Sequence, residues 1–414
     1  MSERSSRDAS SDTGSLPDGS PWVSRRSFLR SASLSVLALG TPSLLASCGT
    51  PGARQTPESC PSEDLSDAER TVNFSNWPSY IDEGTEVVDG RRTTVIPTLR
   101  GFEARSGIEV VYNSDVNDNA EFFAKVRDQL AACEPTGRDL MVITDWAAAR
   151  MVALGWLQKL DRARMPHVDE HLLSRLRSPT WDPGREYSVP WQGGLTGLAY
   201  NARYTTAVDS VEELLTRPDL RGKVSLTSEL NDTMGFMLRI VGADPSNFTD
   251  PEYDRALDRL REVVASGQIR RFTGNDFVRD LDAGNVVACV GWSGDVLGLQ
   301  DSNPDIHWVV PEEGMLIFSD DMLVPNKATH KANAERLMDY YYQPEVAARV
   351  AASVRFLCPV EGAREAMEHI DPSLVENPYI FPDEAFLSQT YSFMTLPEGT
   401  RRRYERSFIQ AMGA

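Results

Sequence analysis

Five short clusters along the chain bring together aromatic, hydroxyl and carboxylate side chains, and each cluster lies at the end of an apolar run. The clusters are Trp77/Tyr80, Thr144/Trp146, Glu229/Asp232, Trp292/Asp295 and Phe318/Asp320. Aromatic faces bury hydrocarbon and attract cations, while a carboxylate compensates an ammonium group that leaves water. A pocket that collected all five clusters would suit an organic cation. A single cluster is more typical of core packing or of a turn.

The stretch VVACVGWSGDVLG, residues 286–298, shows the pattern most clearly. Its apolar, β-forming run predicts a buried strand that ends at Trp292, with Cys289 packed in the core. Ser293 and Gly294 favour a turn. We expect this turn to face a cleft, with Trp292 as an aromatic wall and Asp295 as a carboxylate at its end.

The predicted elements explain how these clusters could meet. Strand and helix patterns alternate, with strands at 70–76, 108–115, 139–145 and 222–229, and helices at 96–107, 120–133, 232–242 and 250–267. This order predicts parallel sheets covered by helices, in which ligands bind beyond the carboxyl ends of strands. The segments 188–201 and 315–325 are expected to cross between two such blocks. The tail from residue 383 has a helical pattern.

The order and spacing of the motifs resemble those of periplasmic polyamine-binding proteins, of the spermidine/putrescine type, from bacterial ABC importers. The resemblance runs from about residue 72 to residue 382 and rests on NWPSYID, DLMVITDW, LGWLQKLD, YSVPWQGGLTGLAYN, VGWSGDV, VVPEEGMLIFSDDMLVP and NPYIFPD. It implies an α/β, two-lobed periplasmic-binding-protein fold (type II, Venus-flytrap) with a ligand cleft between the lobes. The first lobe would comprise residues 71–195 and 318–414, and the second residues 196–317.

The resemblance also implies which residues bind the ligand. They are Trp77, Tyr80, Thr144, Trp146, Glu229, Asp232, Trp292, Asp295, Phe318, Asp320 and Phe356. The implied role is capture of a polyamine and its delivery to the permease, without enzymatic activity, cofactor or metal. Pro78-Ser79 stands where relatives usually have a hydroxyl or acidic side chain, and Phe356 where they usually have Tyr. Both departures leave the ligand open among putrescine, spermidine, agmatine and other cations.

The N-terminal residues predict export and a lipid anchor. SRRSFLR, residues 24–30, precedes an apolar run and then LASC, residues 45–48. This order is typical of a twin-arginine signal followed by a lipoprotein cleavage box. It predicts a signal peptide at 1–47, a lipidated Cys48, and a protein in the periplasm or on the outer face of the cytoplasmic membrane. Residues 48–70, rich in Pro, Ser and acids, predict a flexible tether.

The net charge argues against some classes of partner, and the cysteines bear on possible disulfides. The chain has 42 Lys and Arg against 61 Asp and Glu, a net charge of −19; removal of residues 1–47, with five Arg and four acids, leaves 37 minus 57, or −20. Such a chain is expected to be a monomer that repels nucleic acid and anionic lipid headgroups, so only the lipid would hold it to a membrane. Cys60, Cys133, Cys289 and Cys358 leave the disulfide pairing open, since export permits disulfides.

Two other functions stay open from the residues. A binding protein of the same fold for a sugar would use similar Trp and Asp side chains, whereas an amino acid usually needs an Arg that the clusters lack. HVDEH, residues 167–171, matches a zinc-hydrolase motif in its letters, so a membrane-anchored metal hydrolase is the second alternative. We expect this motif in a loop without a third ligand. No phosphate-binding loop and no G-x-S-x-G motif is present.

Overall fold

The computed structural model describes residues 59–88 and 90–413. Within these residues, ten strands form one sheet with the order β4-β1-β5-β11-β6-β9-β7-β8, in which β10 lies beside β6 and β12 beside β11. β2 and β3 form a separate hairpin. The strands are β1 (Thr71–Asn76), β2 (Gly84–Val88), β3 (Arg91–Val95), β4 (Glu109–Ser114), β5 (Leu140–Thr144), β6 (Ser188–Asn201), β7 (Val224–Thr227), β8 (Ile269–Thr273), β9 (Ala288–Trp292), β10 (Ile306–Val309), β11 (Met315–Leu323) and β12 (Thr390–Tyr391).

Helices connect the parallel strands. They are α1 (Pro97–Ser106), α2 (Asn119–Ala131), α3 (Asp145–Leu154), α4 (Pro166–His171), α5 (Val211–Thr216), α6 (Leu230–Ile240), α7 (Asp250–Ala265), α8 (Phe277–Asp282), α9 (Ser293–Gln300), α10 (Lys331–Tyr341), α11 (Pro344–Val354), α12 (Ala363–Ile370), α13 (Glu384–Leu387) and α14 (Glu398–Met412). The short 3-10 helices are η1 (Arg162–Arg164), η2 (Ser174–Leu176), η3 (Pro218–Leu220) and η4 (Pro372–Leu374). The predicted alternation of strands and helices is confirmed.

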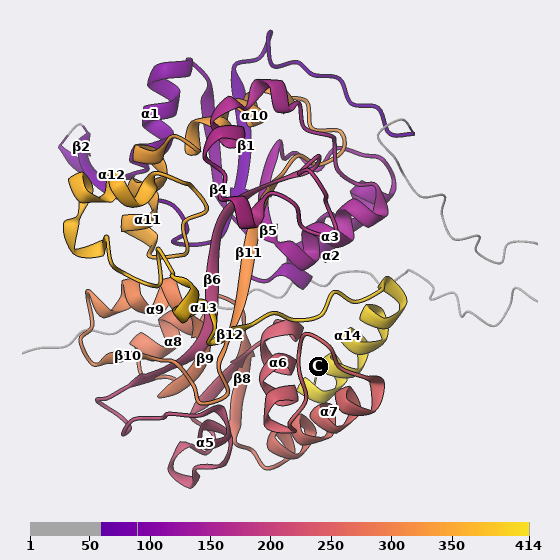
Figure 1. Ribbon diagram of the computed structural model, residues 1–414, viewed down its shortest axis with the longest axis vertical. Helices are drawn as coiled ribbons and strands as arrows, with labels where there is room; N and C mark the ends of the chain where they lie inside the picture. The colour runs from indigo at the N-terminus through magenta and orange to yellow at the C-terminus, as the bar shows by residue number, and fades with distance from the viewer. Residues whose placement is uncertain (1–58, 89, 414) are drawn as a thin grey trace, which may run out of the picture. The chain divides into compact units, whose positions relative to one another are not determined.

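The sheet is parallel on both sides and antiparallel in the middle. β1 pairs in parallel with β4 and β5, and β7 pairs in parallel with β8 and β9. β6 and β11 pair antiparallel to each other between these groups. Figure 1 shows the two long strands running from the elements around α1 and α10 to those around α5 and α7. They are the two predicted crossing segments, 188–201 and 315–325.

Two main hydrophobic cores pack around these crossings, and the first extends to residues of α8, β9 and α9. The first core collects residues of β1, β4, β5 and α1–α3 with α10–α12, and the second collects residues of β7 and α5–α7. α14 packs in the second core, where the ring of Tyr404 stacks 3.6 Å from that of Tyr253. The predicted lobe division placed this helix in the first lobe, with residues 318–414. The packing of α14 in the second core differs from that division, and the lobe boundaries stay a prediction.

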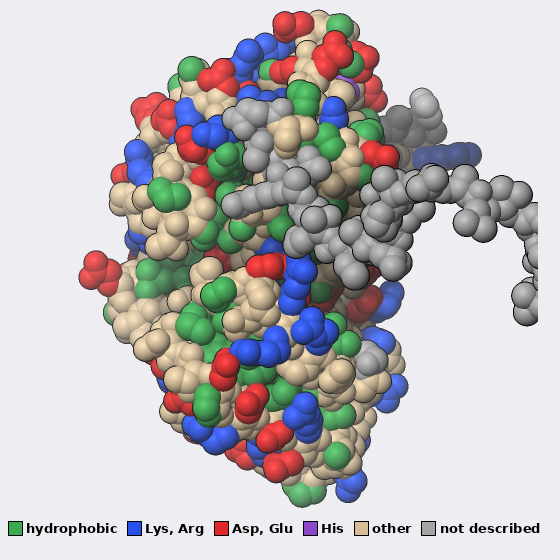
Figure 2. Space-filling view, turned by 90° about the vertical axis from the view of Figure 1, so that its right-hand side faces the viewer, with side chains coloured by type: hydrophobic (Ala, Val, Ile, Leu, Met, Phe, Trp, Pro, Cys, Tyr) green, Lys and Arg blue, Asp and Glu red, His purple; other side chains and the backbone are tan. Residues whose placement is uncertain are grey.

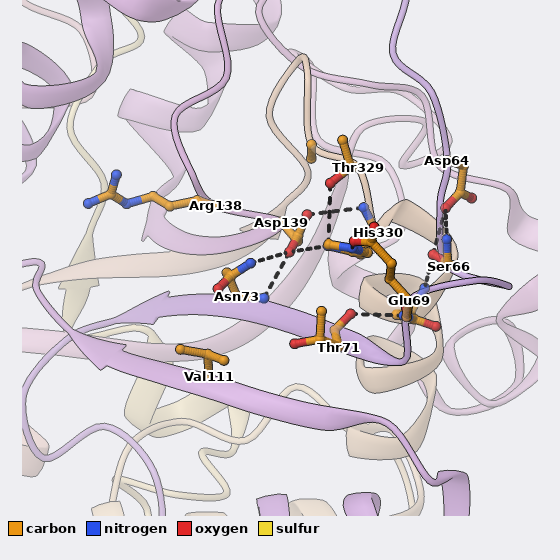
Figure 3. Close-up of polar contacts among 12 residues, drawn as sticks. Asp64, Ser66, Glu69, Thr71, Asn73, Val111, Arg138, Asp139, Thr329 and His330 are labelled. Atoms are coloured by element: carbon orange, nitrogen blue, oxygen red, sulfur yellow. Dashed lines mark hydrogen bonds and ion pairs between the residues drawn. The ribbon is translucent and has the colours of Figure 1, made fainter.

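Residues 60–70 are docked on the first core, which differs from the predicted tether. Cys60 and Cys133 form a disulfide. The His330 Nε2 atom lies 2.9 Å from Glu69, and its Nδ1 atom lies 2.9 Å from Asp139, whose Oδ2 also accepts from Asn73 (Figure 3). The sequence of 59–70 looked like a linker because it is polar, but several of its polar groups are paired with the body of the protein. The signal peptide and Cys48 lie outside the described residues.

No described helix is long and apolar enough to span a bilayer. On the face shown in Figure 2, acidic and basic side chains are interspersed. The acidic excess therefore does not form a single continuous patch on this face.

Candidate functional site

Four of the five predicted clusters lie at the carboxyl ends of strands that belong to the two parallel groups of the sheet. Trp77 follows β1, Thr144 ends β5, Glu229 lies two residues beyond β7, and Trp292 ends β9. Helices α3, α6 and α9 begin at the last three of these points. The fifth cluster comes from β11, where Asp320 pairs directly with Thr144 of β5. This is the arrangement that the strand order predicts for a ligand site.

All eleven predicted binding residues line one cavity. Those residues are Trp77, Tyr80, Thr144, Trp146, Glu229, Asp232, Trp292, Asp295, Phe318, Asp320 and Phe356. Sequence analysis missed other lining residues, including Asn119, Asp145, Trp181, Asn231, Asn275 and the segment 392–395. The structure thus brings the predicted set together, while the binding role of each residue stays a prediction.

Asp295 and Asp320 form the first acidic group of the cavity. Asp320 accepts hydrogen bonds from the Tyr80 hydroxyl at 2.7 Å and the Thr144 hydroxyl at 2.6 Å. Asp295 accepts one from the Asn275 side chain at 3.1 Å. Burial raises the pKa of each carboxyl to about 7, and the charge of Asp320 contributes to the rise at Asp295. Hydrogen-bond donors moderate both shifts.

Glu229 and Asp232 form the second acidic group. The Asn119 backbone and side-chain amides donate to Glu229 Oε1 at 2.7 and 2.9 Å. Asp232 accepts from the Trp292 indole at 2.8 Å and from the Thr196 hydroxyl at 3.1 Å. Burial raises the pKa of Asp232 to about 6 and that of Glu229 well above its usual value. None of the ion pairs found between described residues involves a carboxylate of either group, but Glu229 acts on Arg401 at longer range: burial lowers the pKa of Arg401, and the charge of Glu229 is one of those that oppose this shift.

Aromatic rings form the apolar part of the wall. Trp77 and Trp292 meet edge to face with ring centres 5.7 Å apart, and Tyr80 meets Phe356 in the same way at 4.7 Å. Gly294 makes room for Phe356, since a Cβ atom there would lie 2.2 Å from its ring. The absence of a side chain at Gly294 therefore allows the Phe356 ring to lie close to the backbone of α9.

Two local predictions are wrong. Ser293 and Gly294 do not form a turn; they begin α9, and Asp295 lies in its first turn, because the chain passes directly from strand to helix after Trp292. HVDEH is not in a loop but forms most of α4, where Pro166 begins the helix. His167 Nδ1 contacts Asp339 at 2.7 Å. No group of three or more potential ligands for a metal ion occurs among residues 59–88 and 90–413.

Comparisons with known proteins agree with this architecture. The family described as bacterial extracellular solute-binding protein matches residues 99–376. A putrescine/agmatine-binding protein of Pseudomonas aeruginosa is 29% identical over 352 residues, covering 80% of this chain and 88% of the relative. The spermidine/putrescine-binding periplasmic protein of Escherichia coli is 25% identical over 320 residues, covering 77% and 84%.

A solved structure shares the fold. The putative spermidine/putrescine ABC transporter protein from Listeria monocytogenes superposes with a TM-score of 0.70 at 22% identity, covering 83% of this chain and 99% of that one. The predicted α/β periplasmic solute-binding fold is therefore confirmed.

Proposed function

The chain belongs to the family of bacterial extracellular solute-binding proteins, and we propose that its solute is a polyamine with cationic groups at both ends. The family makes it the extracytoplasmic solute-binding component of an ABC importer and not an enzyme. The observation that carries the polyamine proposal is the cavity itself. Two groups of buried carboxylates, none of them in a close ion pair, lie on a wall built of aromatic rings.

The chemistry of an alkyl diammonium matches this wall. Its methylenes would pack on the faces of Trp77, Trp292 and Phe318, whose π systems also attract ammonium groups. Its charged ends would each find a carboxylate, which offsets the cost of removing an ammonium from water. Mutual repulsion between Asp295 and Asp320 in the empty cavity would fall on binding. The named relatives, which bind putrescine, agmatine or spermidine by their descriptions, support the same ligand class.

Calorimetry and thermal shift of the mature chain test the ligand. We expect heat and a raised melting temperature with putrescine, spermidine or agmatine. Asp295→Asn should weaken binding by about 2 kcal/mol or more, because one ammonium loses its buried carboxylate. Asp276→Asn is the matched control, since that exposed side chain pairs with Arg279 outside the cavity. No response to any polyamine would contradict the proposal, and a response to a sugar alone would favour the alternative of a sugar-binding protein.

We also propose that the protein is exported by the twin-arginine route and anchored through Cys48. The order of the arginine pair, apolar run and LASC box supports both steps. Labelling of cells with a palmitate analogue should mark the wild-type protein and leave Cys48→Ser unlabelled. Equal labelling of both would contradict the anchor.

A further inference from the structure

One arginine of α14 lies directly behind the cavity wall. Arg401 is 4% exposed, and its guanidinium carbon lies 4.2 Å from the centre of the Trp146 ring. Its Nη2 atom donates to Asn231 Oδ1 at 3.0 Å. Trp146 and Asn231 line the cavity, but Arg401 does not. Any effect of Arg401 on a ligand would therefore pass through these two neighbours.

Arg401 has no carboxylate to itself: burial lowers its pKa, and the charges of Glu405 and of Glu229 in the cavity oppose that shift. Its Nη1 atom lies 3.6 Å from Glu405 and has no hydrogen-bond partner among the described residues. Arg150 contacts the same Glu405 carboxylate at 3.3 Å, so two guanidinium groups share it. Arg185 provides the contrast: it lies near another wall residue, Trp181, but pairs at 2.6 Å with Asp321, which contacts no other cation in the described chain.

This part of the wall is unfavourable for an ammonium group. A cation on one face of an indole uses the electrostatic attraction of the ring and repels a second cation on the opposite face. Trp146 and Asn231 also lie in the first turns of α3 and α6, whose positive dipole ends add to the effect. Asp145 precedes Trp146 and also lines the cavity, but burial raises its pKa to about 7, which reduces its negative charge near neutral pH. The side chains of Trp146 and Asn231 can therefore accept methylenes but disfavour positive charge.

The position of this wall makes it relevant to ligand length. Asn231 immediately precedes Asp232 of the second acidic group, and Trp146 lies two residues from Thr144, which contacts Asp320 of the first. The Trp146/Asn231 wall therefore adjoins both acidic groups along the chain and lines the same cavity.

We propose that Arg401 is a positioning residue that restricts the cavity to ligands with two cationic groups. It holds Trp146 against the cavity and places a positive charge behind it, so that a third ammonium is disfavoured. This inference rests on the proposed polyamine function and names the ligand class within it: diamines such as putrescine, in preference to the triamine spermidine.

Two substitutions of Arg401 separate its charge from its packing. Putrescine and spermidine are titrated calorimetrically into the mature wild-type chain, Arg401→Met and Arg401→Lys. We expect the ratio of the spermidine Kd to the putrescine Kd to fall about tenfold in Arg401→Met, which removes the charge, and to be largely kept in Arg401→Lys. Arg403→Met is the matched control on the same helix, because Arg403 is exposed and pairs with Asp250. Its ratio should equal that of the wild type.

A third variant moves the ratio in the opposite direction. Glu405→Gln removes the shared carboxylate, leaves Arg401 in place, and should raise the ratio by weakening spermidine further. If the melting temperature shows that Arg401→Met does not fold, Glu405→Gln alone still tests the role of the Arg401 charge. A ratio that moves in neither variant would overturn the inference. A wild-type chain that binds neither polyamine would instead overturn the proposed function.

Discussion

The cluster around His330 and the wall of the cavity both contain buried carboxylates, but only the first pairs its buried carboxylate with a basic side chain. His330 lies 2.9 Å from both Asp139 and Glu69 (Figure 3), whereas Asp295 and Asp320 accept hydrogen bonds only from neutral groups. Burial alone lowers the pKa of His330, yet its contacts with the two carboxylates raise it overall. Carboxylates that hold the fold together carry their own counter-ion, and those of the cavity lack one.

The same contrast occurs between two adjacent residues of β11. Asp321 pairs with Arg185 at 2.6 Å, while its neighbour Asp320 faces the cavity without a cation. The register of β11 against β6 shifts between these two positions. Neighbouring carboxylates in one strand thus belong to the two different classes, which makes them a matched pair for experiment.

The largest expected effect comes from exchanging this pair for amides, one at a time. Asp321→Asn should lower the free energy of unfolding by about 3 kcal/mol, because it leaves the buried Arg185 guanidinium without its carboxylate. Asp320→Asn should keep or raise the stability of the ligand-free protein, since it removes an unpaired buried acid. Urea denaturation without ligand measures both. Equal losses in the two variants would show that the distinction between paired and unpaired carboxylates is wrong.

A smaller effect is expected at His330. His330→Gln should cost about 2 kcal/mol at pH 6, the scale of hydrogen bonds to charged groups. Because the pKa of His330 is raised in the folded protein, its stabilisation is fully present below about pH 6.5 and is lost as the pH rises through the folded value. The stability difference between wild type and variant should therefore shrink towards pH 9. A difference that grows with pH would contradict the charged state assigned to His330.

The smallest effect is expected in the cavity, where ligand affinity should rise with pH, whereas the stabilisation by His330 falls. Raised pKa values of about 7 mean that Asp295 and Asp320 hold protons at low pH, which a cationic ligand must displace. Putrescine should bind about tenfold more weakly at pH 6 than at pH 8 and should release protons on binding. Calorimetry at pH 7 in two buffers of different ionisation enthalpy counts those protons. Proton uptake, or tighter binding in acid, would place the ligand elsewhere.

The sequence predicted the residues of the cavity because strand ends leave a local signal. Trp77, Thr144 and Trp292 each follow a readable apolar run, and parallel strands bring such ends together. Asn119 left no such signal, since an Asn near a helix start is usually a local cap. Arg401 lies in a run of three arginines on an amphipathic helix, and only tertiary packing distinguishes it from its exposed neighbours.

Contacts between residues far apart in the sequence were not predicted either. The Cys60–Cys133 disulfide joins residues 73 positions apart, and nothing local in the sequence favoured that pairing over the alternatives. Residues 60–70 looked like a linker because they contain few apolar residues, but hydrogen bonds to residues 327–333 dock them. The β2–β3 hairpin was missed although Asp-Gly at 89–90 is a hairpin signal.

The Cys60–Cys133 disulfide also sets the length of the linker between the proposed lipid anchor and the folded protein. For a protein anchored at Cys48, as proposed, only the 12 residues to Cys60 separate the lipid from the folded body, rather than the 22 residues to position 70. Fully extended, 12 residues reach about 40 Å. A binding protein on so short a linker can reach only a small volume next to the membrane. For a permease inside that volume, its effective concentration would be on the order of millimolar. Delivery of solute would then depend on geometry more than on diffusion.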